Sequence, residues 1–146
     1  MSITLDYTSN APVAPVVAAQ VVAEANALVD SFDWWGEPIT IDVSSKRISG
    51  STRVRLGGYG FVEVPKEEEA LMVCRDTRFI VSQLVTWSTK YAISWQLSEM
   101  GSEVGAVVGG KPDGKLAGYV SGLCKGLKLP ESAVPDVLKK HEARKY

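Results

Sequence analysis

The spacing of the apolar residues switches several times along this chain of 146 residues, and that switching constrains the fold more than any motif. Val17, Val21, Leu28 and Phe32 recur at the helical interval, which predicts a long first helix over residues 13–31. Its other positions are mostly alanine and valine, without lysine or arginine. We therefore expect an unusually large part of this helix to be buried, in the core or at a dimer interface.

Segments in which apolar and polar residues alternate predict five short strands. Glycine-containing stretches between them predict turns, among them residues 49–51. Residues 1–10 are polar and predict either an edge strand or a loose tail. The five alternating segments are residues 39–44, 53–56, 59–64, 93–97 and 104–108.

Further helical patterns separate and follow these strands. Asp76 is expected to cap a second helix that runs to Tyr91, and the short apolar run before it also favours a helix. A third helix is expected over residues 114–127, capped by Asp113, with a short last helix after it. The order α-β-β-β-α-β-β-α-α predicts one α+β domain over residues 1–146, with an antiparallel five-stranded sheet in two hairpin-type groups.

Charge is distributed unevenly although the net charge is −1. Residues 1–45 hold six acidic residues and no basic one, so residues 46–146 carry a net charge of +5. We favour mutual neutralisation of the two halves, in the fold or across a dimer, over a charged binding face.

Cys74 and Cys124 each lie among apolar neighbours, which predicts buried thiols in a reducing compartment. A disulfide stays possible, but the sequence does not place the two sulfur atoms. The first basic residue is Lys46, so the N-terminus lacks the basic segment of a secretory signal, and the uncharged run over residues 7–23 is too short for a membrane span. These features predict a cytoplasmic protein without membrane attachment.

Residues 109–116, GGKPDGKL, come close to the phosphate-binding pattern GxxxxGK[ST]. Leu116 stands where a magnesium-binding hydroxyl is required, and the 31 residues after Lys115 contain no further strand-like run. We therefore interpret this segment as a connection between a hairpin and a helix. Backbone amides at the helix start, near Gly114, could still hold an anion together with Lys111 and Lys115.

Catalytic and metal-binding patterns are weak. The single histidine, His141, lies near the C-terminus among charged residues and is expected to be solvated. The two cysteines lack the spacing of a zinc site, so neither a metal nor a cofactor is expected. Carboxylate pairs such as Asp30 with Asp33, or residues 67–69, could act as acid and base only if one were desolvated.

A basic hairpin provides the main surface candidate. Arg53 and Arg55 lie on one face of an expected strand, with Tyr59 nearby, in a region that has no acidic residue. Cations beside aromatic rings can bind single-stranded nucleic acid, but the acidic balance of the chain argues against it. The alternatives are pairing with the acidic first 45 residues or with an acidic protein partner.

Trp34 and Trp35 are adjacent in an expected turn, so one is predicted to enter the core and the other could be exposed as an interface anchor. Trp87 and Trp95 lie on regular apolar stripes and are expected in the core. Together with Arg53, Arg55 and Tyr59, the tryptophan pair forms the predicted partner-binding surface.

We find no set of side chains in the sequence that is typical of a catalytic site, and we therefore predict a non-catalytic protein-binding module. We expect it to form a homodimer through the first helix. The element order is similar to that of small dimeric secretion chaperones, without a matching motif, and a cognate inhibitor would show the same features. The alternative is a small-molecule or anion-binding protein, with a pocket between the sheet and the helix at residues 114–127.

Overall fold

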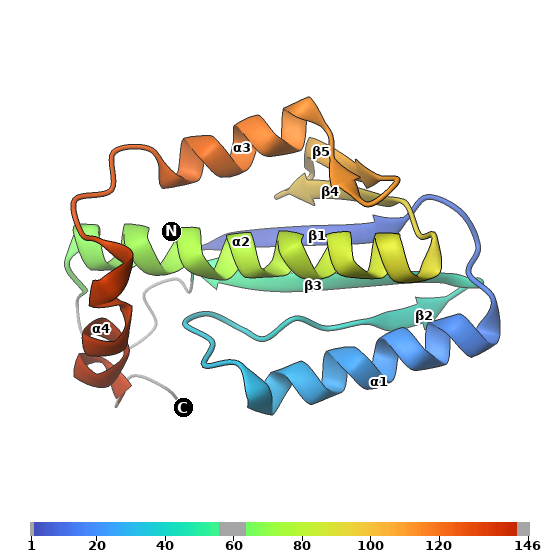
Figure 1. Ribbon diagram of the computed structural model, residues 1–146, viewed down its shortest axis with the longest axis horizontal. Coiled ribbons are helices and arrows are strands. Elements are labelled where there is room, and N and C mark those ends of the chain that lie inside the picture. The colour runs from blue at the N-terminus through green and yellow to red at the C-terminus, as the bar shows by residue number, and fades with distance from the viewer. Residues whose placement is uncertain (1, 56–63, 143–146) are drawn as a thin grey trace.

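The computed structural model describes residues 2–55 and 64–142. They form an α+β fold in which one antiparallel sheet is covered by helices on one face (Figure 1). In chain order the elements are β1 (Ile3–Ser9), α1 (Pro15–Ser31), β2 (Asp42–Ser44), β3 (Arg47–Arg55), α2 (Lys66–Tyr91), β4 (Trp95–Glu99), β5 (Ser102–Val108), β6 (Lys111–Pro112), α3 (Gly114–Cys124), the short 3-10 helix η1 (Glu131–Ala133) and α4 (Val134–Lys140).

The described sheet has six strands in the order β2-β3-β1-β4-β5-β6, not the predicted five in two hairpin groups. Two of these strands were not among the predicted ones. Strand β6 lies inside the expected connection at residues 109–116, and β1 is neither an edge strand nor a tail but pairs with both β3 and β4. Leu5 and Tyr7 are fully buried, whereas Thr4, Asp6 and Thr8 alternate with them on the other face. This half-polar alternation is the normal pattern of a strand in a sheet with one covered face.

Strand β3 is longer than predicted and runs through residues 49–51, where we expected a turn. Gly50 pairs with Tyr7, and a Cβ atom at position 50 would lie 1.9 Å from the carbonyl oxygen of Thr40 and 2.2 Å from the Tyr7 ring. The glycine therefore allows close packing inside a strand. The turn lies earlier, at Ser45 and Lys46, which both adopt positive φ (50° and 67°) without glycine.

Helix α2 crosses the covered face of the sheet, with α1 on one side of it and α3 on the other (Figure 1). It begins at Lys66, ten residues before the predicted cap Asp76, which therefore lies in the interior of the helix. The charged residues 66–69 form the first turn, where glutamates are favourable near the positive end of the helix dipole. The predicted helix over the apolar run before Asp76 is confirmed.

The predicted connection around residues 109–116 is confirmed. Gly109 and Gly110 form the turn between β5 and β6 with positive φ (59° and 77°). The Asp113 side chain then caps α3 by accepting the backbone N–H of Leu116 at 2.8 Å. The phosphate-like pattern is therefore a hairpin turn followed by a helix cap.

A disulfide joins Cys74 of α2 to Cys124 of α3 across 50 positions of sequence. The prediction of two free thiols is therefore wrong. The apolar neighbours correctly indicated buried positions, but sequence spacing could not show that α2 and α3 bring the two residues together.

The main core lies between the sheet and the three long helices and includes Trp87 and Trp95, both fully buried as predicted. A second apolar cluster holds α4 against the start of α2 through Trp35, Met72 and Val137. Its edge is completed by His141, which is buried rather than solvated. Of the predicted strand at residues 59–64, positions 59–63 lie outside the described residues.

Candidate functional site

The prediction that one of the two adjacent tryptophans could serve as an exposed anchor is wrong. Trp34 is 6% exposed and Trp35 is 2% exposed. They enter different apolar clusters: Trp34 packs against Phe32 and Phe79, whereas Trp35 contacts the ring of His141. The loop inserts both rings by directing them to opposite sides, so neither is available to a partner.

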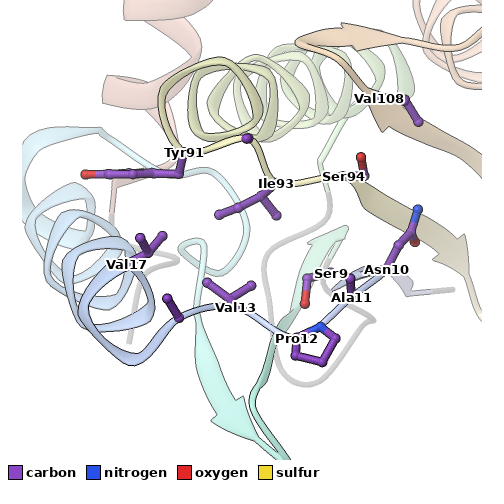
Figure 2. Close-up of a pocket in the computed structure, with 12 residues that line it drawn as sticks. Ser9, Asn10, Ala11, Pro12, Val13, Val17, Tyr91, Ile93, Ser94 and Val108 are labelled. Atoms are coloured by element: carbon purple, nitrogen blue, oxygen red, sulfur yellow. The ribbon is translucent and has the colours of Figure 1, made fainter.

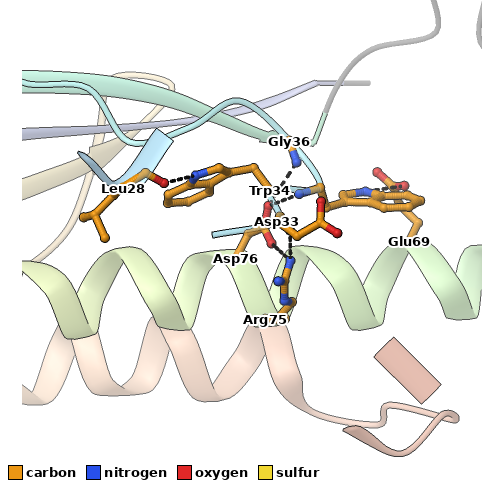
Figure 3. Close-up of polar contacts among 8 residues, drawn as sticks. Leu28, Asp33, Trp34, Gly36, Glu69, Arg75 and Asp76 are labelled. Atoms are coloured by element: carbon orange, nitrogen blue, oxygen red, sulfur yellow. Dashed lines mark hydrogen bonds and ion pairs between the residues drawn. The ribbon is translucent and has the colours of Figure 1, made fainter. Parts of the chain in front are cut away.

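Asp76 holds this loop in place (Figure 3). One oxygen of its buried carboxylate accepts the backbone N–H groups of Trp35 and Gly36, both at 2.9 Å. The other oxygen accepts a hydrogen bond from Arg75, which also donates to the carbonyl of Asp33. Burial raises the pKa of Asp76 to about 6, despite these partners, because desolvation penalises the charged carboxylate. These contacts fasten the loop after α1 to the middle of α2.

The arginines of the predicted surface form ion pairs inside the chain. Arg53 binds Glu37 with distances of 3.1 and 2.8 Å from Nε and Nη2 to Oε2, and this bonding holds the pKa of Glu37 below its usual value. Arg55 pairs with Glu69 at 3.4 Å. The alternative in which the basic hairpin neutralises the acidic first 45 residues is therefore confirmed for Arg53. Tyr59 lies outside the described residues.

The candidate anion site at the start of α3 is exposed and partly occupied by the protein's own groups. Lys115 pairs with Glu103 at 3.2 Å, and the Asp113 carboxylate already accepts one of the helix N–H groups. Lys111 and Gly114 are exposed on the same connection. A carboxylate at this helix start competes with any external anion.

Two of the other candidate acids and bases, His141 and Glu68, contact each other. Nε2 of His141 lies 2.7 Å from Glu68, which also binds Lys140, and the contact with His141 lowers the pKa of Glu68. This cluster fastens the C-terminal segment to α2. Within residues 2–55 and 64–142, no group of three or more His, Cys, Asp or Glu side chains is placed to hold a metal ion.

The outward face of α1 carries almost no charge. Ala18, Val21 and Ala25 point into the core, and Val16 on the opposite side is 71% exposed. Asp30 is the one charged side chain on the outward face. The exposed positions of this face are Val16, Ala19, Gln20, Ala23, Asn26, Ala27 and Asp30.

A pocket with a volume of about 400 Å³ opens beside the N-terminal end of α1 (Figure 2). Three segments line it: residues 9–14 with Val17, residues 91–94 at the end of α2, and Val108 at the end of β5. Sequence reasoning missed this pocket because its walls are far apart along the chain. One wall, residues 9–14 with Val17, belongs to the uncharged stretch over residues 7–23.

Comparison of the chain with protein-family models, with curated proteins and with solved structures gives no match. Among the described helices, none combines the length and apolar character needed to cross a lipid bilayer.

Proposed function

We propose that this protein is a non-catalytic protein-binding module and that the outward face of α1 is its contact surface. The supporting observation is the composition of that face, where valine and alanine are exposed and the one charged residue is Asp30. A surface helix of a monomer normally carries charged and polar residues on its outer side. Contiguous exposed apolar surface is typical of interaction sites.

A second copy of the chain is the partner that this face fits most simply. The 17 residues of α1 span about 25 Å, and the alanines at positions 19, 23 and 27 allow the backbone of another helix to approach closely. Two such faces can pair around a two-fold axis, the commonest symmetry of homo-oligomers. We therefore propose the outward face of α1 as the contact surface instead of Trp34 and Trp35, because both tryptophans are buried.

Sedimentation over micromolar to submillimolar concentrations tests this proposal. The wild-type protein is expected to approach twice the monomer mass, and Ala23→Arg is expected to remain monomeric because it places a charge in the centre of the face. Ala117→Arg is the matched control, since Ala117 is also an exposed helical alanine but lies on α3. A wild-type monomer throughout, or equal effects of both substitutions, would contradict pairing through α1.

A chaperone or an inhibitor would both use such a surface, and the class of client stays a proposal. Our expectation of a cytoplasmic location rested partly on free thiols. The disulfide between Cys74 and Cys124 removes that support, because structural disulfides persist mainly in oxidising compartments. We therefore propose that the protein acts in an oxidising compartment, where the disulfide persists.

The alternative, a small-molecule or anion-binding protein, has less support at the position we predicted. Asp113 and Glu103 place carboxylates beside Lys115 at the start of α3. The pocket beside α1 includes Val108, which pairs with Lys111 in the connection to α3, and this pocket is considered separately below.

A further inference from the structure

We infer that the pocket beside α1 is a binding site for a small neutral molecule that has an apolar body and one oxygen acceptor, as in a ketone, ester or lactone. This inference is independent of pairing through the outward face of α1. It rests on the shape of the pocket, on the chemistry of its walls and on the way its two loops are held.

The walls are preorganised by contacts within the protein (Figure 2). The backbone N–H of Asn10 donates to the carbonyl of Ser94 at 2.9 Å and joins the two loops that flank the opening. The backbone N–H of Val13 donates to the carbonyl of Lys46 at 2.7 Å. On the far wall, the Tyr91 hydroxyl donates to the carboxylate of Glu24 in α1. A cavity fixed in this way needs little ordering when a ligand enters.

The lining selects an uncharged ligand. Val13, Val17, Ile93 and the Tyr91 ring provide apolar contact area, and none of the 12 lining residues is Asp, Glu, Lys, Arg or His. A charged ligand would lose hydration here without gaining a counter-ion from the lining. An apolar body would instead cover walls that otherwise face water.

The polar groups of the lining explain the expected oxygen acceptor. Ser9 is 2% exposed, and its Oγ accepts the backbone N–H of Ile48 at 3.1 Å. Ser9 lines the pocket, and because its contact with Ile48 uses only the oxygen as an acceptor, the hydroxyl proton can donate to a ligand oxygen. Ser94 offers a second hydroxyl at the opening.

The size of the pocket favours a small molecule over a protein surface. Its volume of about 400 Å³ lies near the lower end of the range for small-molecule sites, about 300–1,000 Å³. The 12 lining residues are fewer than the roughly 20–30 residues that each partner contributes to a stable protein interface.

Two fluorescent probes with the same aromatic body test the inference. Phenylnaphthylamine is neutral, whereas anilinonaphthalenesulfonate carries a sulfonate on the same ring system. We expect the neutral probe to bind with increased fluorescence and the sulfonate to bind about tenfold more weakly or less. Methyl hexyl ketone should displace the neutral probe, and octanoate should not.

Four variants locate the bound probe. Val13→Phe and Val108→Phe narrow the pocket from opposite walls and should each weaken probe binding about tenfold or more. Val108 is 56% exposed, so its substitution should not affect folding. Val16→Phe, on an exposed neighbour outside the lining, and Ala23→Arg, on the outward face of α1, should both bind like the wild type.

The inference is overturned if methyl hexyl ketone does not displace the neutral probe, if octanoate competes as well as the ketone, or if both narrowing variants bind like the wild type. Loss of probe binding in Ala23→Arg would place the probe on α1 and would also overturn it. Because sedimentation reports on pairing alone, failure of either proposal is distinguishable from failure of the other.

Discussion

The buried carboxylate of Asp76 accepts the backbone N–H of Trp35 at 2.9 Å, although 41 positions separate the two residues in the sequence. This contact fastens the loop after α1 to the middle of α2. It also explains how two adjacent tryptophans can both be buried. Asp76 binds the backbone N–H groups of Trp35 and Gly36 and so fixes the direction of the chain at this point.

The pKa of Asp76 predicts a specific pH dependence of stability. Burial raises the pKa from 3.8 to about 6, so between these values the folded protein binds more protons than the unfolded chain. The free energy of unfolding contributed by Asp76 is therefore fully present below pH 4 and is lost as the pH rises through 6. Asp76→Asn removes this titration while keeping an oxygen that can accept the two N–H groups.

Urea unfolding of both proteins from pH 4 to pH 7 measures the effect. The stability of the wild type minus that of Asp76→Asn should fall by on the order of 2–3 kcal/mol over this range. Glu37 and Glu68 have lowered pKa values, so their contribution to stability rises with pH. Both proteins contain these residues, and taking the difference cancels their contribution. A difference that is constant or increases with pH would contradict a raised pKa at Asp76.

The disulfide should make a large contribution to stability because it closes a long loop. With 50 positions between Cys74 and Cys124, loss of the cross-link is expected to lower the free energy of unfolding by about 4 kcal/mol through chain entropy. Dithiothreitol should reduce the urea midpoint of the wild type to that of a variant with alanine at both cysteine positions. The double variant itself should not respond to dithiothreitol, and a wild type that also fails to respond would contradict a cross-linked native state.

Gly50 should tolerate no side chain, because its pairing with Tyr7 leaves no space for a Cβ atom. Gly50→Ala is expected to cost about 3 kcal/mol or more through overpacking. Gly118→Ala is the matched control on α3, where nothing lies within 4 Å of the added carbon, and it should stabilise the helix by up to about 1 kcal/mol. Equal thermal shifts for both variants would show that the close packing at Gly50 is not present in solution.

Local patterns predicted the parts of the fold that depend on neighbours in sequence. The helical stripes identified α1 and α3 to within a few residues, and Asp113 was correctly identified as a cap because a cap bonds within its own helix turn. The turn at Gly109 and Gly110 was found for the same reason.

Features that depend on distant contacts were misread. Gly50 has the composition of a turn, and the approach of Tyr7 and Thr40 that requires it comes from other segments. Asp76 has the composition of a helix cap, but its partners belong to the loop after α1. The polar residues of β1 predicted an edge strand or a loose tail, whereas a central strand of a sheet with one covered face carries the same alternation.

For the candidate sites too, features set by neighbours in sequence were predicted better than features set by distant contacts. Exposed charge was predicted as a contact surface at Arg53 and Arg55, yet both arginines are paired within the chain. The absence of basic residues from α1 predicted that an unusually large part of the helix is buried, whereas within the chain the buried residues of α1 are Ala18, Val21 and Ala25. Burial of the remainder at a dimer interface stays a prediction. Which positions remain outside could be determined only from the packing of the helix.

Site-specific photo-cross-linking from position 23 tests most directly whether the outward face of α1 contacts a second copy. A photoreactive side chain replaces Ala23 in one sample and the control alanine at position 117 in another, and both positions are exposed. We predict a product of twice the monomer mass from position 23, with cross-linked peptides from α1 of the second chain, and none from position 117. Absence of this product from position 23, or equal yields from the two positions, would contradict the proposed surface.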